Sequence, residues 1–368
     1  MKNLSNKTIK NDYIKDLNFD TIKQIDTENM YQLLTDYGKL IKDAVKKSAS
    51  VKNYKTKKIK NILILGIGGS AMAGELIKSY IKYSNANKNV EINVVRGTEI
   101  PNNIKENSCV FCCSYSGNTA ETLEALGKIK EFTSNIIAIT SGGKLAEIAK
   151  EKDYDLLNIP TGMMPRCAMF YSFFYLLYAM FQFNLFDDFN ENNIKTAIKK
   201  IISDDFCKSL DYSSIDNDNN SIMIARLCQG KIPIIYTGAE RLEAVNLRWR
   251  GQIQENANQL CFGNYFPELN HNEINGWMFP SDLLNRFVVI AMKDVDDSKE
   301  LNVAISNSLD LLSENGIEVV EVVVAGNTLL ERIVRLICLA DWVSFYLAIM
   351  NNTNPTPIPM IMKLKEKM

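Results

Sequence analysis

The 368-residue sequence contains only one histidine, His271. A single imidazole cannot supply the several histidine ligands of most zinc enzymes, so a multi-histidine metal site is excluded. Neither sign of charge is in excess, because 42 Lys and Arg balance 43 Asp and Glu to give a net charge of -1. Nucleic-acid binding depends on clustered basic side chains that displace counterions. We therefore expect no metal centre and no nucleic-acid partner.

Long apolar runs are equally scarce. Residues 1–17 contain no apolar segment of the kind found in signal peptides. The most apolar run, residues 168–183, is shorter than the ~20 residues that a membrane helix needs, so we interpret it as a buried helix. Cys109 and Cys112 form a C-x-x-C pair without a second pair or a histidine nearby, and we interpret the eight cysteines as free thiols. These features predict a cytoplasmic protein without a membrane partner.

Short β-rich runs alternate with helical stretches in the first half of the chain. The runs occupy residues 61–66, 91–97, 109–114, 135–140 and 155–160. Helical segments are expected from Ser70, Asn118 and Gly143. Apolar strands separated by helices indicate a parallel sheet that is covered on both faces. Residues 1–55 precede this pattern, and the apolar spacing between Met30 and Val45 predicts a helical N-terminal segment.

The same alternation restarts near residue 231. Strands are expected over 231–238, 286–293 and 316–324, and helices over 239–259, from Ser298 and over 332–350. The predicted fold class is α/β, with two three-layer α/β/α domains built on parallel sheets after a helical lead-in. The expected boundaries are 1–55 for the lead-in, 56–210 for the first domain and 211–368 for the second.

A glycine turn, Gly66–Ser70, follows the first strand and opens a helix. Small residues let a ligand approach the backbone, and a helix N-terminus favours an anion, so phosphate is the expected ligand. Gly66, Gly68 and Ala71 also satisfy the dinucleotide pattern G-x-G-x-x-A, but Arg96 lies near the end of the next strand in place of the ribose-binding acid. A turn that binds no ligand is a further alternative.

A second loop, Ser114–Thr119, follows the 109–114 strand and carries hydroxyls at Ser114, Ser116 and Thr119. Hydroxyls beside a helix N-terminus can hold the oxygens of a phosphate. The alternative is simple helix capping by Ser116 or Asn118. A third loop, Thr140–Gly143, follows the next strand, and the three loops together favour a phosphate site over capping alone.

The segments GIGGSAMAG, SYSGNTAET and ITSGGKLAEIA resemble the sugar isomerase (SIS) domain, a phosphosugar-binding α/β fold with a five-stranded parallel sheet. PTGMMPRCA, QENANQ and ELNHNEINGW further resemble the bifunctional phosphoglucose/phosphomannose isomerase family, whose members carry two SIS domains and form homodimers. The resemblance covers the chain from about residue 60 onward. It implies a cofactor-free, metal-independent isomerase that interconverts glucose 6-phosphate, and mannose 6-phosphate, with fructose 6-phosphate through an enediolate.

The resemblance also implies catalytic roles. Glu255 matches the base that moves a proton between C1 and C2, and Arg166 matches the arginine that stabilises the enediolate oxygens. His271 matches the ring-opening histidine, which in the family reaches the active site from the neighbouring subunit. The adjacent Glu268 or Glu273 could orient its ring.

Further residues are expected to bind the substrate. The phosphate is assigned to the backbone of two glycines and to four hydroxyls, namely Gly68, Gly69, Ser70, Ser114, Ser116 and Thr119. Near the C-terminus, Asn354 replaces the aspartate of the family's Asp-Pro-Thr-Pro pattern but keeps its turn-forming ability. There Thr356 is linked to acceptance of both C2 epimers, and Lys363, in preference to Lys365, is expected to contact the substrate.

Two other functions are compatible with SIS domains. A non-catalytic phosphosugar sensor would need neither Glu255, His271 nor Arg166. An amidotransferase that makes glucosamine 6-phosphate would need an ammonia source, typically a glutaminase domain with an N-terminal cysteine, whereas no cysteine precedes Cys109. The isomerase, with a phosphorylated hexose as substrate and a second copy of the chain as partner, is the preferred interpretation.

Overall fold

The computed structural model describes residues 17–52, 59–84, 86, 89–203, 206–213 and 219–367. The chain divides into two compact units, which are residues 39–202 and residues 1–38 together with 203–368. The helical lead-in contains three helices, α1 (Phe19–Ile25), α2 (Met30–Thr35) and α3 (Tyr37–Ser48). The predicted lead-in also covers residues 1–16 and 53–55, which lie outside the described residues.

The unit of residues 39–202 is built on a five-stranded parallel sheet with the order β2-β1-β3-β4-β5. The strands are β1 (Asn61–Leu65), β2 (Glu91–Val95), β3 (Ser108–Cys113), β4 (Ile136–Thr140) and β5 (Asp155–Asn158). Apolar runs 61–66, 91–97, 109–114, 135–140 and 155–160 predicted all five. Strand order reverses direction between β1 and β3, and ligands of open α/β sheets bind outside the carboxyl ends of the strands at such a point.

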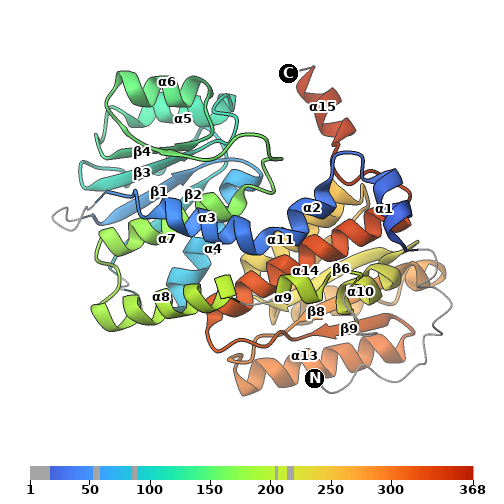
Figure 1. Ribbon diagram of the computed structural model, residues 1–368. Helices are drawn as coiled ribbons and strands as arrows, with labels where there is room; N and C mark the ends of the chain where they lie inside the picture. Colours follow the sequence, from blue (N-terminus) through green and yellow to red (C-terminus); the bar gives the residue numbers. More distant parts are fainter. Residues whose placement is uncertain are drawn as a thin grey trace. The chain divides into compact units, whose positions relative to one another are not determined.

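Helices cover both faces of this sheet (Figure 1). On one face α5 (Ala120–Ile129) and α6 (Gly143–Glu151) bury Leu126 and Leu145 against the strands. On the other face α4 (Gly69–Tyr83) packs against β1, β2 and α7 (Met169–Gln182). Nearly every side chain of α7 is buried, which confirms the interpretation of the apolar run 168–183 as a core helix. The unit ends with α8 (Asp188–Ser203).

The other unit is built on a four-stranded parallel sheet with the order β7-β6-β8-β9. The strands are β6 (Ile232–Gly238), β7 (Phe262–Phe266), β8 (Phe287–Met292) and β9 (Glu318–Val322). Three of them were predicted, whereas no strand was expected over 262–266. The missed strand lies at the sheet edge, and its sequence FGNYF contains Gly and Asn in place of a continuous apolar run.

Helices again cover both faces. α13 (Lys299–Glu314) packs on one face, where Ile305 and Leu309 contact the strands. α10 (Asn220–Cys228) and α11 (Glu243–Asn256) pack against α14 (Leu329–Met350). The shorter elements of this unit are α9 (Phe206–Ser209), η2 (Glu268–His271), α12 (Glu273–Gly276), η3 (Ser281–Arg286) and α15 (Pro359–Lys365). The unit is therefore a second three-layer α/β domain.

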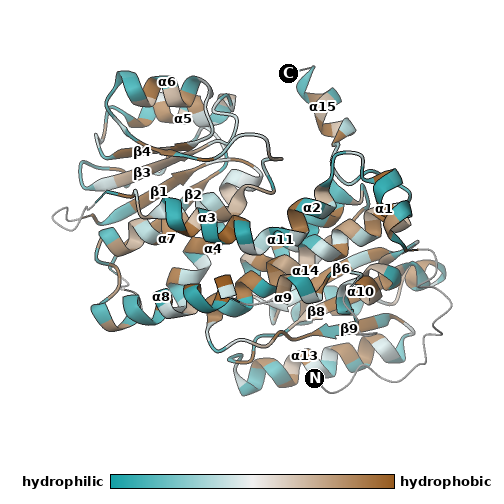
Figure 2. Cartoon of the chain, in the orientation of Figure 1, coloured by the Kyte–Doolittle hydropathy of each residue, from teal (hydrophilic) through white to brown (hydrophobic). Residues whose placement is uncertain are grey.

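Figure 2 shows that strands such as β3 and β4 are hydrophobic (brown), whereas the helices that cover them alternate between hydrophilic (teal) and hydrophobic residues. This pattern is expected for layers that share a buried core. Within the described residues, α14 alone is long and apolar enough by composition to cross a membrane. The apolar window of α14 is 89% buried inside the protein, which is the behaviour of a core helix.

Candidate active site

The glycine turn Gly66–Ser70 lies at the carboxyl end of β1, beside the end of β3. A Cβ on Gly66 would lie 3.1 Å from the carbonyl oxygen of Cys113 and 3.1 Å from the amide nitrogen of Ala71, so a side chain there would crowd the backbone. Gly68 has a φ of +57°, which side chains rarely adopt. Gly68 is exposed and Gly69 and Ser70 are partly exposed, so the N-terminal turn of α4 is open to a ligand.

The hydroxyl loop, Ser114–Thr119, lies at the carboxyl end of β3. The Oγ of Ser114 lies 2.9 Å from the Oγ1 of Thr119 and accepts a hydrogen bond from the amide of Gly117 at 3.1 Å. The Oγ of Ser116 accepts from the amide of Asn118 at 3.3 Å and is exposed. Because the hydroxyls of Ser114 and Thr119 face one another, this loop presents a compact group of oxygens and amides.

These contacts bear on the capping alternative. α5 begins at Ala120, not at Asn118 as predicted, and Thr119 is its N-cap without a side-chain capping bond. The Oδ1 of Asn118 instead accepts a hydrogen bond from the amide of Lys144 at 3.0 Å, in the first turn of α6. Capping of α5 by Ser116 or Asn118 is therefore wrong, because Asn118 connects the hydroxyl loop to the next loop along the sheet.

The third loop, Thr140–Gly143, interlocks with the hydroxyl loop. The amide of Ser141 donates to the carbonyl oxygen of Tyr115 at 3.0 Å. Gly117 has a φ of +70°, and a Cβ added to it would lie 1.9 Å from the carbonyl oxygen of Gly142. A Cβ on Gly143 would lie 2.3 Å from the carbonyl oxygen of Ser116. Only glycine fits at 117 and 143, so the two loops form one tightly packed surface.

Arg166 belongs to the arginine loop, residues 160–168, which runs from the end of β5 to α7. Arg166 is 2% exposed. A Cβ on Gly69 would lie 3.1 Å from the Cα of Arg166 and 3.1 Å from the carbonyl oxygen of Pro165, so this loop packs against the start of α4. The structure thus gathers the predicted phosphate residues and Arg166 at one edge of the five-stranded sheet. They are Gly68, Gly69, Ser70, Ser114, Ser116, Thr119 and Arg166.

The remaining predicted residues, Glu255, His271, Thr356 and Lys363, belong to the other unit. Glu255 is half-buried in the last turn of α11. The indole of Trp249 donates to the carbonyl oxygen of Leu336 at 3.0 Å, and Arg248 pairs with the buried Asp341 at 2.9 Å. Both contacts join α11 to α14, so the helix that carries Glu255 is held firmly in the core.

His271 is exposed at the end of η2. The two neighbouring carboxylates are engaged by other side chains. Glu273 accepts hydrogen bonds from the hydroxyl of Tyr236 and, at 2.6 Å, from the side-chain Nδ2 of Asn264. Glu268 accepts from the side-chain Nδ2 of Asn272 at 3.1 Å. Burial and the bond to Glu273 raise the pKa of Tyr236 far above its usual value, so that this phenol stays protonated.

The C-terminal segment has the turn expected from its sequence. The Oδ1 of Asn354 accepts a hydrogen bond from the amide of Thr356 at 3.1 Å, and its Nδ2 donates to the hydroxyl of Thr27 at 2.8 Å. Thr356 is 5% exposed. Lys363 and Lys365 are both exposed on the short helix α15.

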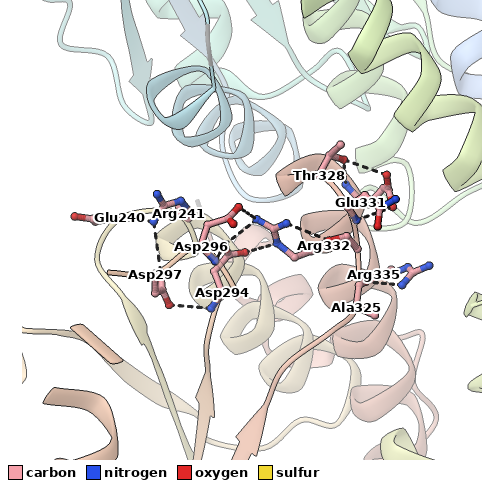
Figure 3. A network of polar contacts seen from close by, with 12 residues as sticks. Glu240, Arg241, Asp294, Asp296, Asp297, Ala325, Thr328, Glu331, Arg332 and Arg335 are labelled. Carbon is pink, nitrogen blue, oxygen red and sulfur yellow. Dashed lines mark hydrogen bonds and ion pairs between the residues drawn. The ribbon is translucent and has the colours of Figure 1, made fainter. Parts of the chain in front are cut away.

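The carboxyl edge of the four-stranded sheet carries charged side chains where the five-stranded sheet has hydroxyls, and these charged residues were not predicted from sequence. Arg332, in α14, makes two hydrogen bonds to Asp294, with Nε at 2.7 Å and Nη2 at 2.8 Å, and also pairs with Asp296. Asp297 accepts from the amide of Asp294 at 2.8 Å and lies 3.6 Å from Arg241. Figure 3 shows this ion-pair network at the ends of β6 and β8. Its members are far apart in sequence, so no local pattern indicates it.

Sequence comparison matches the SIS domain family over residues 56–185 and the bacterial phospho-glucose isomerase C-terminal SIS domain family over residues 217–368. A bifunctional phosphoglucose/phosphomannose isomerase of Caldicellulosiruptor bescii is 34% identical over 86% of this chain and 91% of its own length. A D-glucosamine-6-phosphate 4-epimerase of Sulfolobus acidocaldarius is 30% identical over 84% of this chain and 90% of its own length.

The fold is also similar to a solved structure. The C-terminal domain of glucosamine-fructose-6-phosphate aminotransferase from Francisella tularensis superposes with a TM-score of 0.69 at 17% identity, covering 89% of this chain and 97% of that one. This likeness concerns the fold alone. The two SIS domain matches and the similarity over most of the chain show the family: the chain belongs to the bifunctional phosphoglucose/phosphomannose isomerase family.

Proposed function

We propose that this protein interconverts glucose 6-phosphate and mannose 6-phosphate with fructose 6-phosphate. The proposal rests on the family membership of the chain and on the residues that lie together at one edge of its five-stranded sheet. There the glycine turn, the hydroxyl loop and Arg166 lie side by side at the point where strand order reverses. The phosphate would be bound by Ser70, Ser114, Ser116 and Thr119 together with the first amides of α4.

The proposed chemistry begins with ring opening. His271 would return a proton to the ring oxygen while the C1 or C2 hydroxyl loses one, a transfer suited to an imidazole because its two ring nitrogens can donate and accept protons. Its exposure at the end of η2 supports a role in which it reaches a neighbouring active site. On this basis we propose a homodimer with His271 contributed across the interface.

Isomerisation of the open sugar then needs a base and a positive charge. Glu255 would take the C2 proton of the aldose and deliver it to C1, and the reverse reaction would use the same carboxylate. The enediolate oxygens that form between these steps would be stabilised by the fixed charge and planar donors of Arg166. The half-buried position of Glu255 on a firmly packed helix supports a base that keeps one geometry.

Acceptance of both C2 epimers is assigned to Thr356, and a further substrate contact to Lys363. The buried position of Thr356 and the turn closed by Asn354 support a fixed pocket wall at this point. The reaction as written moves protons only, so it needs no cofactor. All eight cysteines are reduced thiols, and seven of them are buried, which supports the reducing cytoplasm as the location.

A second candidate is sugar-phosphate epimerisation, because one relative of similar identity is a D-glucosamine-6-phosphate 4-epimerase. It predicts turnover of glucosamine 6-phosphate without formation of fructose 6-phosphate from glucose 6-phosphate. A non-catalytic phosphosugar sensor predicts binding of all these compounds and turnover of none.

One experiment separates the three. Purified protein is incubated with glucose 6-phosphate, mannose 6-phosphate or glucosamine 6-phosphate, and the products are followed by NMR, with and without a chelator. We expect fructose 6-phosphate from the first two substrates at rates that the chelator leaves unchanged. Absence of fructose 6-phosphate from both hexose phosphates would overturn the proposed function, and loss of activity with the chelator would overturn the metal-independent chemistry.

A further inference from the structure

Tyr115 has no assigned role, although it lies between two of the proposed phosphate-binding serines. Its side chain extends from the hydroxyl loop to the arginine loop. The phenolic hydroxyl donates to the carbonyl oxygen of Pro160 at 3.1 Å and accepts from the amide of Met163 at 2.9 Å. One hydroxyl therefore joins both ends of the four-residue segment 160–163 and closes it into a turn.

This turn leads directly to Arg166. Gly162 within it has a φ of +86°, so the chain reverses sharply there. The carbonyl oxygen of Met164 then accepts hydrogen bonds from the amides of Cys167 at 2.9 Å and Ala168 at 3.2 Å, which begins the turn before α7. Arg166 lies inside this second turn, three residues after the end of the turn that Tyr115 closes.

The backbone of Tyr115 is anchored as firmly as its side chain. Its carbonyl oxygen accepts from the amide of Ser141 at 3.0 Å and from the hydroxyl of Ser141 at 2.6 Å. Tyr115 thus contacts the third loop through its backbone and the arginine loop through its side chain, while its neighbours Ser114 and Ser116 belong to the hydroxyl loop. Tyr115 is therefore the residue at which the hydroxyl loop, the third loop and the arginine loop meet.

We propose that Tyr115 is a positioning residue that sets Arg166 relative to the phosphate-binding loops through Pro160 and Met163. The inference rests on the proposed function for the role of Arg166 in catalysis. Since a misplacement of about 1 Å can lower a rate about a hundredfold, loss of one hydroxyl that holds this loop is expected to act on turnover. Phosphate binding should change little, because the hydrogen bonds within the hydroxyl loop do not use the Tyr115 hydroxyl.

The test is Tyr115→Phe, which removes the bridging oxygen and keeps the ring. Tyr346→Phe is the matched control, because the hydroxyl of Tyr346 also donates to a backbone carbonyl, that of Leu210, at 2.9 Å in the other unit. We expect Tyr115→Phe to lower kcat about tenfold to a hundredfold and to leave the Kd for inorganic phosphate within about twofold. Tyr346→Phe should leave both values within about twofold.

A double-mutant cycle with Arg166→Ala separates positioning from a general structural effect. Residual turnover is measured at high enzyme concentration. If Tyr115 acts through Arg166, the loss caused by Tyr115→Phe shrinks to less than about twofold in the Arg166→Ala background. Losses that multiply, or an unchanged kcat in the single variant, would overturn the proposal.

Hydrogen exchange at the Met163 amide tests the bridge independently of catalysis. Exchange should be faster in Tyr115→Phe than in the wild type and unchanged in Tyr346→Phe. If the wild type fails to isomerise hexose phosphates, the proposed function fails while this measurement still decides whether Tyr115 holds the loop. Equal exchange rates at Met163 in Tyr115→Phe and the wild type would show that it does not.

Discussion

The side-chain amide of Asn256 donates a hydrogen bond to the hydroxyl of Ser344 at 2.9 Å, joining the last turn of α11 to the middle of α14. The Ser344 hydroxyl in turn donates to the carbonyl oxygen of Asp341 at 2.9 Å. Both side chains are buried. Because Asn256 follows Glu255 directly, this bond fixes the end of the helix that carries the proposed base.

Ser344→Ala removes this bond, so we expect a loss of about 1 kcal/mol in the free energy of unfolding, measured by urea denaturation. Ser209→Ala is the control, since the Ser209 hydroxyl makes a similar bond to Phe206 but is exposed. A Ser344→Ala variant as stable as the wild type would contradict the importance of this contact.

Glu255→Gln keeps the shape of the side chain but removes its basicity. We expect exchange of the C2 proton with deuterated solvent to fall at least about a hundredfold, because general base catalysis contributes that much, while phosphosugar binding persists. Glu243→Gln makes the same change at an exposed position of α11 and should leave exchange intact. Retained exchange in Glu255→Gln would remove Glu255 as the base.

Gly117→Ala places a methyl group into the contact between the hydroxyl loop and the third loop. The positive φ and the 1.9 Å approach to the carbonyl oxygen of Gly142 predict a loss of about 2–4 kcal/mol in stability and weaker phosphate binding. Gly127→Ala is the control within α5, where a Cβ would meet nothing within 4 Å. Gly127→Ala should stabilise the protein by about 0.5–1 kcal/mol. A loss of stability in this variant would contradict the open space around Gly127.

Asn354→Asp should be tolerated, because a carboxylate can accept from the amide of Thr356 and from the hydroxyl of Thr27. Asn354→Ala loses both bonds. We expect the Ala variant, and not the Asp variant, to change the ratio of the mannose 6-phosphate and glucose 6-phosphate rates. An unchanged ratio in Asn354→Ala would show that this turn has no role in epimer selection.

Cysteine labelling tests the two cores. Burial raises the pKa of Cys113 to about 12, so its thiol stays protonated and unreactive at pH 8. Burial likewise raises the pKa of Cys261 to about 12. Iodoacetamide followed by mass spectrometry should modify the partly exposed Cys207 first, and Cys113 and Cys261 only after unfolding. Labelling of Cys113 in the folded protein at the rate of Cys207 would contradict its burial.

Local patterns in the sequence were sufficient for the five-stranded sheet and for the loops at its edge. β3 is buried along its whole length and reads as a continuous apolar run. The glycine turn and hydroxyl loop follow strands, so their placement at one edge follows from parallel pairing. By contrast, β7 is half-exposed, and Gly263 interrupts its apolar sequence pattern. A Cβ added to Gly263 would lie 2.4 Å from the carbonyl oxygen of Ile235.

Contacts between distant parts of the chain could not be predicted. The hydroxyl of Tyr115 contacts residues 45 and 48 positions later, and Arg332 pairs with Asp294, 38 positions earlier. Nothing in the local pattern of either segment indicates its partner. The start of α5 was missed for a related reason, because Asn118 bonds to α6 and not to its own helix.

The Arg332 ion-pair network bears on binding stoichiometry. A phosphate dianion at the edge of the four-stranded sheet would meet the carboxylates of Asp294, Asp296 and Asp297, and the guanidinium of Arg332 is already neutralised by two of them. The edge of the five-stranded sheet offers hydroxyls and amides instead. Although the two domains share one plan, titration calorimetry should therefore saturate at one hexose phosphate per chain. In that case only the five-stranded sheet would bind the phosphate, and the unit of the four-stranded sheet would contribute the proposed Glu255 and His271.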